Sequence, residues 1–251
     1  ILRTGGKAIK NVTGYDLTSL FTGSEGTLGV VTRALFRLIP MPKRRGTLQV
    51  MFRTLDDGCR TIHTVLQSGL VPAAAEIMDR TCLEVVARHR KTDLDPEVGA
   101  CIIIEIDGDD DAALETQTKR IEAAAKACGA VAFRAARSEQ EAEELWAVRR
   151  GLSSAVAALA PNRIGEDISV PRDAFPEVVR RIREISEKHG LPIAVYGHAG
   201  DGNIHPSILC DLGKPGEAER VHRAVDEIFA AALAVGGTLS GEHGIGITKR
   251  P

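Results

Sequence analysis

Strand-like and helix-like apolar patterns alternate in a definite order from residue 46 onward, and this order constrains the fold more than any other feature. Over residues 46–135 the periodicity predicts strand, helix, strand, helix, strand, helix and strand. Over residues 164–240 it predicts a strand, a helix, two strands joined by a tight turn, a further helix and a short extended piece. Between these segments, residues 138–159 read as one long helix.

The later segment has the β-α-β-β-α-β order of a ferredoxin-like split unit, and the earlier one has the same order with one extra helix. Two such units predict an α+β fold, in which an antiparallel sheet carries helices on one side. A chain of 251 residues is long enough to bury a core of this size.

Residues 1–45 have a different character. They contain the turn-rich cluster Gly23–Gly29, then apolar residues 30–39 that read as strands, then a proline-containing basic stretch, residues 40–45, that reads as a linker. Glycines at this spacing allow the backbone to approach a phosphate or ring oxygen closely, although a simple turn before a strand explains them equally well. The strand–glycine–helix order of a Rossmann site is absent from this stretch.

Composition excludes several classes of function. The formal net charge is −2 and aromatic residues make up 4% of the chain, which argues against a nucleic-acid-binding surface. Five scattered cysteines without a C-x-x-C pair indicate reduced thiols rather than a disulfide framework. No apolar run approaches the roughly 20 residues of a membrane span. We therefore expect a cytoplasmic protein, with any membrane association arising through its partners.

The stretch Tyr196–Pro206 reads Y-G-H-A-G-D-G-N-I-H-P and predicts a hairpin with two histidines around a tight turn. His198 and His205 would lie roughly opposite each other, at about 5 Å, close enough to share a metal ion. Glu242 adds a carboxylate, and the neighbouring His243 would then be free to act as a base. The alternative is that these histidines are structural. Asp201 would either support one of them or shape the turn.

A metal ion beside a base fits hydrolysis by metal-bound water, oxidation of a hydroxy acid, or a metal-binding module without catalysis. Oxidation also needs a hydride acceptor and a cation that holds the substrate carboxylate. Arg149 and Arg150 are candidates for that cation because guanidinium groups match carboxylates, although exposed arginines are common on helices.

Two stretches, Lys10–Leu17 and Gly23–Thr32, resemble the end of the FAD-binding domain in flavoproteins of the vanillyl-alcohol-oxidase type. Gly197–Pro206 and Gly241–Gly244 resemble motifs of their C-terminal cap domain. Over essentially its whole length, the chain is similar to the branch that contains the FAD-linked subunit of glycolate oxidase, D-lactate dehydrogenase and D-2-hydroxyglutarate dehydrogenase.

This resemblance implies a cofactor and a metal site. The hydride acceptor would be N5 of FAD, and His198, His205 and Glu242 would hold a divalent metal, usually zinc in this branch. His243 would be the general base. Contacts with FAD are expected from the glycine-rich segment, at Ser24, Gly26, Thr27, Gly29 and Val31.

The resemblance also implies substrate-binding residues. Arg149, directly after Leu145–Val148, matches the arginine that binds the substrate carboxylate, and Asn203 matches a residue that contacts substrate. Ser153 stands where the D-2-hydroxyglutarate enzymes have a threonine. Gly165 stands where they have a lysine that clamps a distal carboxylate, and its absence favours glycolate or D-lactate.

The expected organisation is the end of an FAD-binding domain with its linker, residues 1–45, followed by the cap or substrate domain, residues 46–251. Because the chain begins at Ile1 and stops just after the candidate site, we expect a fragment that alone binds FAD weakly or not at all and is inactive. The expected partners are a small 2-hydroxy acid and an electron acceptor or partner subunit.

Overall fold

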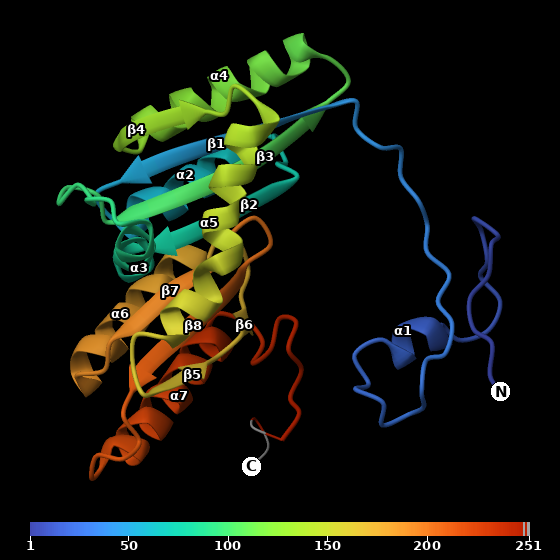
Figure 1. Cartoon of the computed structure of the whole chain (residues 1–251). Helices are drawn as coiled ribbons and strands as arrows, with labels where there is room; N and C mark the ends of the chain where they lie inside the picture. Colours follow the sequence, from blue (N-terminus) through green and yellow to red (C-terminus); the bar gives the residue numbers. More distant parts are fainter. Residues whose placement is uncertain (248, 250–251) are drawn as a thin grey trace. The chain divides into compact units, whose positions relative to one another are not determined.

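A single antiparallel sheet forms the centre of residues 42–241 in this computed structural model, which describes residues 1–247 and 249 (Figure 1). The strand order is β4-β1-β3-β2-β7-β8-β5, and β6 also pairs with β8. In chain order the strands are β1 (Arg44–Phe52), β2 (Ala74–Asp79), β3 (Ala100–Gly108), β4 (Ala130–Ala135), β5 (Asn162–Gly165), β6 (Ile168–Ser169), β7 (Ile193–His198) and β8 (Asn203–Cys210).

Six helices of the same unit pack on this sheet, and a short helix, α1, lies in the other unit. The second unit consists of residues 1–41 together with the residues from 242 onward. The helices are α1 (Leu17–Phe21), α2 (Leu55–Gln67), α3 (Arg80–Arg90), α4 (Asp111–Ala127), α5 (Glu139–Ala157), α6 (Phe175–His189) and α7 (Glu217–Ala234). The predicted domain boundary after residue 45 stays a prediction, and residues 248, 250 and 251 of the predicted second domain lie outside the described residues.

The two ferredoxin-like halves are both present. The first has the strand order β4-β1-β3-β2. The second has the same order if the bridge between Ser169 and Thr238 is counted as its fourth strand, followed by β6, β8 and β7. Pairing between β2 and β7, with Ile77 opposite Gly197, joins the halves into one sheet. The predicted α+β fold is confirmed.

Helices cover both faces of the sheet, whereas the sequence led us to expect them on one face. The main core contains buried residues of α2, α4, α6 and α7. A second core contains residues of α3 and α5, which cover the opposite face (Figure 1). On that face these helices pack on Met78, Cys101 and Tyr196. Those sheet residues are at most 3% exposed, so this face is apolar too and needs its own cover.

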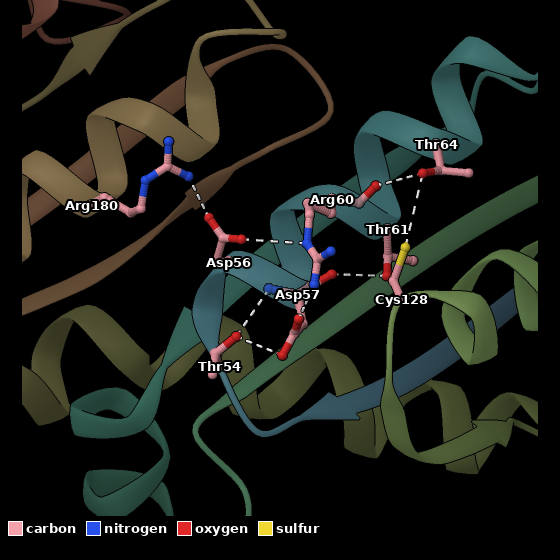
Figure 2. A network of polar contacts seen from close by, with 8 residues as sticks. All are labelled: Thr54, Asp56, Asp57, Arg60, Thr61, Thr64, Cys128 and Arg180. Atoms are coloured by element: carbon pink, nitrogen blue, oxygen red, sulfur yellow. Dashed lines mark hydrogen bonds and ion pairs between the residues drawn. The ribbon is translucent and has the colours of Figure 1, made fainter.

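Polar contacts also connect the halves on the side of α2 and α6. Thr54 caps α2 by accepting a hydrogen bond from the backbone N–H of Asp57, and Arg180 of α6 contacts Asp56 of α2 (Figure 2). Arg60 contacts both aspartates. The arginine side chains are more than half exposed, so water screens these ion pairs and they contribute little to stability. Packing along β2 and β7 is therefore the main link between the halves.

Three local predictions were wrong. Residues 30–39 form no strand among the described residues, because no neighbouring strand pairs with them and Val30, Phe36 and Ile39 remain exposed. Part of the predicted linker, residues 40–45, is strand, since β1 already begins at Arg44. The strand predicted over residues 164–170 is interrupted opposite Pro206, which has no N–H group to donate to the ladder.

No helix in the described part of the chain combines the length and the apolar character that crossing a membrane requires.

Candidate functional site

The hairpin of β7 and β8 carries two of the predicted metal ligands. Tyr196 pairs with His205, and His198 pairs with Asn203. The two histidines are therefore diagonal neighbours on one face, and our expectation that they lie opposite each other was wrong. Their ring centroids are nevertheless 5.2 Å apart, with the ring planes at 90°. The hairpin thus brings both imidazoles together, because residues two apart on a strand share a face with their cross-strand partners.

The turn of this hairpin depends on glycine at two positions. Gly202 has φ +88°, and a Cβ atom there would lie 2.1 Å from the carbonyl oxygen of Val170. A Cβ atom at Gly197 would lie 2.3 Å from the carbonyl oxygen of Asn203. Asp201 accepts a hydrogen bond from the backbone N–H of Asn203 at 3.4 Å, so of its two predicted roles the structure supports the one in the turn.

A carboxylate from the other ferredoxin-like half orients His198. Glu76 on β2 pairs in register with His198, and its Oε1 lies 2.5 Å from the imidazole Nδ1. Its Oε2 accepts a hydrogen bond from Nε of Arg149 at 2.7 Å. The Glu76 and Arg149 side chains are 7% and 12% exposed. A carboxylate on Nδ1 fixes the ring orientation and directs Nε2 toward any ligand, the usual arrangement around a metal-binding histidine.

A second carboxylate lies beside His205. The register of β5 and β6 against β8 places Asp167 opposite this histidine, with its Oδ1 3.6 Å from Nδ1. The hydroxyl of Ser240 donates a hydrogen bond to the other carboxylate oxygen at 2.9 Å. Asp167 is fully buried and His205 is 7% exposed. Both imidazoles of the pair therefore have an acidic neighbour.

This donor set fits a divalent metal with nitrogen and oxygen ligands, such as zinc. Two imidazoles share one face of the sheet, and each has the carboxylate neighbour that metal-binding histidines usually have. Glu242 and His243 belong to the unit that contains residues 1–41 and the residues from 242 onward. Their predicted roles as third ligand and base stay predictions.

The other predicted substrate residues, Ser153 and Asn203, lie near the sheet face that carries the two histidines, whereas Arg150 does not. Ser153 on α5 accepts a hydrogen bond at its hydroxyl from Nη1 of Arg163 at 2.9 Å. Asn203 is 7% exposed, and its amide packs so closely on Gly241 that a Cβ atom there would lie 2.6 Å from the amide nitrogen. Arg150, the alternative to Arg149, is exposed and contacts Glu143 instead.

Sequence reasoning missed Arg163 on β5. Its guanidinium donates hydrogen bonds to Ser207 Oγ at 3.1 Å and to Tyr196 Oη at 3.2 Å, in addition to its contacts with Ser153. It also occupies the space beside Gly165, where a Cβ atom would lie 2.7 Å from Nη2. The only signal in the sequence was its position two residues before Gly165, which places both residues on one face of a strand.

Comparison with known proteins identifies the family. The model of the family "FAD linked oxidases, C-terminal domain" matches residues 41–251. This chain belongs to that family. The match covers the hairpin and the Glu-His pair, it confirms the resemblance to FAD linked oxidases, and it identifies the sheet that carries His198 and His205 as part of such an oxidase.

Two relatives illustrate the similarity. The "Glycolate oxidase subunit GlcD" of Bacillus subtilis (strain 168) is 41% identical over 251 residues, which cover 100% of this chain and 53% of the relative. The "Probable D-lactate dehydrogenase, mitochondrial" of Danio rerio is 32% identical over 255 residues, covering 100% of this chain and 51% of the relative. The chain thus spans about half the length of these relatives.

A solved structure supports the fold. The 4-ethylphenol oxidase of Gulosibacter chungangensis, solved with isoeugenol, matches with a TM-score of 0.58 at 20% identity. The match covers 80% of this chain and 46% of that chain. At this identity the likeness concerns the fold of the FAD linked oxidase domain and not its substrate.

The glycine-rich segment that was predicted to contact FAD lies in the other unit and forms a turn. The backbone N–H of Thr27 donates to the carbonyl of Ser24 at 2.9 Å, and Gly26 has φ +79°. Glu25 accepts hydrogen bonds from the backbone N–H groups of Ile245 at 2.7 Å and Gly246 at 3.0 Å. These N–H groups lower the pKa of the Glu25 carboxyl. Glu25 therefore connects the glycine-rich segment to the residues that follow the Glu-His pair.

A cavity of about 330 Å³ adjoins the contact between Glu76 and His198. Glu76 and His198 contribute its polar wall, and Leu66, Val71 and Pro72 contribute its apolar wall. Its size suits a small molecule.

Proposed function

We propose that this FAD linked oxidase oxidises a small D-2-hydroxy acid, with glycolate or D-lactate favoured, to the 2-oxo acid. When bound, FAD supplies the hydride acceptor and a divalent metal supplies a Lewis acid for the substrate oxygens. The printed names of the relatives, a glycolate oxidase subunit and a D-lactate dehydrogenase, support this choice of substrate class.

The observation that carries the proposal is the imidazole pair of His198 and His205, each beside a carboxylate, in a domain of this family. We infer that these two residues and Glu242 hold the metal, for which zinc suits the ligand types. Two neutral imidazoles and one carboxylate leave coordination positions for the substrate, as in other catalytic sites of this kind.

The other proposed roles concern the substrate and the flavin. His243 takes the proton of the substrate hydroxyl as general base. Ser153 and Asn203 bind and orient the substrate, and Arg149 is the first candidate for its carboxylate because the resemblance assigns it that role. The FAD contacts that we propose come from the glycine-rich segment, at Ser24, Gly26, Thr27, Gly29 and Val31.

Two further points concern partners. An oxidase of this kind passes its electrons to an acceptor, and the relative's printed description as a subunit supports a partner subunit. The expected cytoplasmic location stays a prediction. Metal-dependent hydrolysis is not favoured, because it gives no role to the FAD of the family to which the chain belongs.

The proposal is tested with the full-length flavoprotein under anaerobic conditions. Glycolate, D-lactate, L-lactate and D-2-hydroxyglutarate are mixed with it in turn, and the visible absorbance of the oxidised flavin is followed. We expect rapid bleaching with glycolate or D-lactate, and slower or no bleaching with the other two acids. If none of the four acids bleaches the flavin, the proposed function is wrong.

A further inference from the structure

Arg163 is a cation whose hydrogen-bond partners are all neutral. Its guanidinium donates to the hydroxyl and carbonyl oxygens of Ser153, to the hydroxyl of Ser207 and to the hydroxyl of Tyr196. Within the described residues of 42–241, it takes part in no ion pair. A half-buried guanidinium normally has an anionic partner, since removing a charge from water is costly unless it is paired.

Arg149 differs in this respect. Its charge is already matched by Glu76, whose second oxygen contacts His198. The buried Glu76 carboxylate already lies 2.7 Å from Nε of Arg149. A substrate carboxylate at Arg149 would therefore have to displace Glu76 or bring a second negative charge close to it. Arg163 has a positive charge, and its hydrogen-bond partners include no carboxylate with which a substrate would compete.

Tyr196 links Arg163 to one of the candidate metal ligands. Tyr196, which accepts its hydrogen bond, packs against His205 with ring centroids 5.7 Å apart. The bare backbone at Gly165 leaves the space that the guanidinium occupies. A guanidinium group therefore fills the space beside Gly165.

We propose that Arg163 is a substrate-binding residue that receives the carboxylate of the 2-hydroxy acid, and that Arg149 is a positioning residue acting through Glu76 on His198. This inference rests on the proposed function, and it reassigns the carboxylate partner within the same site. A 2-hydroxy acid carries its carboxylate on the carbon next to the hydroxyl, so the proposal requires the hydroxyl to lie at the histidine pair while the carboxylate contacts Arg163.

The test uses the full-length flavoprotein and a ligand that cannot be oxidised. 2-Hydroxy-2-methylpropanoate has the carboxylate and the hydroxyl but no hydrogen on carbon 2, and its amide is the uncharged match. Calorimetry gives the Kd of both ligands for the wild type and for Arg163→Gln, Arg163→Lys and Arg149→Gln. Arg181→Gln is the matched control, since Arg181 is a half-buried arginine of α6 in an ion pair with Glu177.

We expect Arg163→Gln to weaken binding of the acid by about 10- to 100-fold and to change binding of the amide by less than about threefold, because the lost bond is charge-assisted. Arg163→Lys should keep part of the preference for the acid, since it keeps the charge without the fork. Arg149→Gln should keep the acid preference but weaken metal retention against a chelator. Arg181→Gln should change neither quantity.

Three results would overturn the inference: equal weakening of acid and amide in Arg163→Gln, no change in either, or loss of the acid preference in Arg149→Gln instead. These results are separate from a failure of the proposed function. That failure would appear as an unbleached flavin with every hydroxy acid, whereas the binding preference is measured without turnover.

Discussion

The imidazole of His198 is held by Glu76, whose Oε1 lies 2.5 Å from Nδ1, although 122 residues separate the two in the sequence. This contact crosses the pairing of β2 with β7, where the two ferredoxin-like halves meet. One half therefore supplies the histidines and the other supplies the carboxylate that orients the first of them. The assembly of the complete sheet is thus a condition for the site.

Glu76→Gln should weaken metal binding by about 10- to 100-fold while leaving both histidines in place, because the amide orients His198 less strongly than a carboxylate does. The measurement is the metal Kd of the full-length protein, obtained by competition with a chromophoric chelator. Glu187→Gln, an exposed change on α6, serves as control. An unchanged Kd in Glu76→Gln would show that Glu76 does not support a metal ligand.

Gly202→Ala should lower the free energy of unfolding by about 3 kcal/mol or more, since its Cβ would collide with backbone as well as adopt a left-handed conformation. Gly129→Ala is the matched control: it has φ +87° and no atom within 4 Å of the added Cβ, so strain alone should cost about 1–2 kcal/mol. Urea denaturation of both variants measures the difference. If both variants lose the same free energy of unfolding, the β7–β8 turn relaxes to accommodate the added Cβ and the predicted collision is absent.

Asp79 should make stability depend on pH. Burial is the main cause that raises the pKa of this carboxyl from 3.8 to about 6, although it accepts hydrogen bonds from the N–H groups of Cys82 and Val195. The folded state therefore binds more protons than the unfolded state between pH 4 and 6 (roughly, from these two values). Its contribution is most favourable below this window and decreases as the pH rises through it, by an amount on the order of 3 kcal/mol.

The measurement is the urea midpoint at several pH values, for the wild type and for Asp79→Asn. The substitution should remove the decrease between these pH values, since an amide does not titrate there. Asp226→Asn, at an exposed position on α7, should leave the decrease intact. If the stability of the wild type rises over this pH window and Asp79→Asn behaves identically, Asp79 is not the cause of the predicted pH dependence.

Much of this architecture could be predicted from local patterns, because the periodicity of apolar residues determines each strand and helix separately. The ferredoxin-like order and the hairpin around Gly202 followed from such patterns. Glu76 and Arg163 did not, because their roles depend on which distant strands pair and on how α5 crosses the sheet. Asp167 is an intermediate case: extending the β8 register past Pro206 would have placed it opposite His205.

The second helical layer was missed for a related reason. Apolar residues such as Met78 and Tyr196 were assigned to strands, but their common face becomes visible only when β2, β3 and β7 are placed side by side. Once these strands are placed side by side, their shared apolar face predicts that a helix such as α5 packs on it.

His243→Ala in the full-length protein should slow flavin reduction by D-lactate or glycolate by about 10²- to 10⁴-fold, the usual contribution of a general base. Substrate binding should change little, because the proposed base is not the carboxylate partner. Stopped-flow absorbance at several substrate concentrations separates rate from affinity. His222→Ala, an exposed histidine on α7, should behave as wild type. A His243→Ala enzyme with the wild-type reduction rate would remove His243 from the mechanism.

The central claim is that His198 and His205 hold a divalent metal, and the metal-to-flavin ratio of the full-length protein tests it most directly. Elemental analysis after gel filtration should give about one metal, zinc by the ligand chemistry, for each flavin in the active wild type. His205→Ala should retain its flavin but lose the metal and the activity together. An active wild type without a stoichiometric divalent metal would contradict the account.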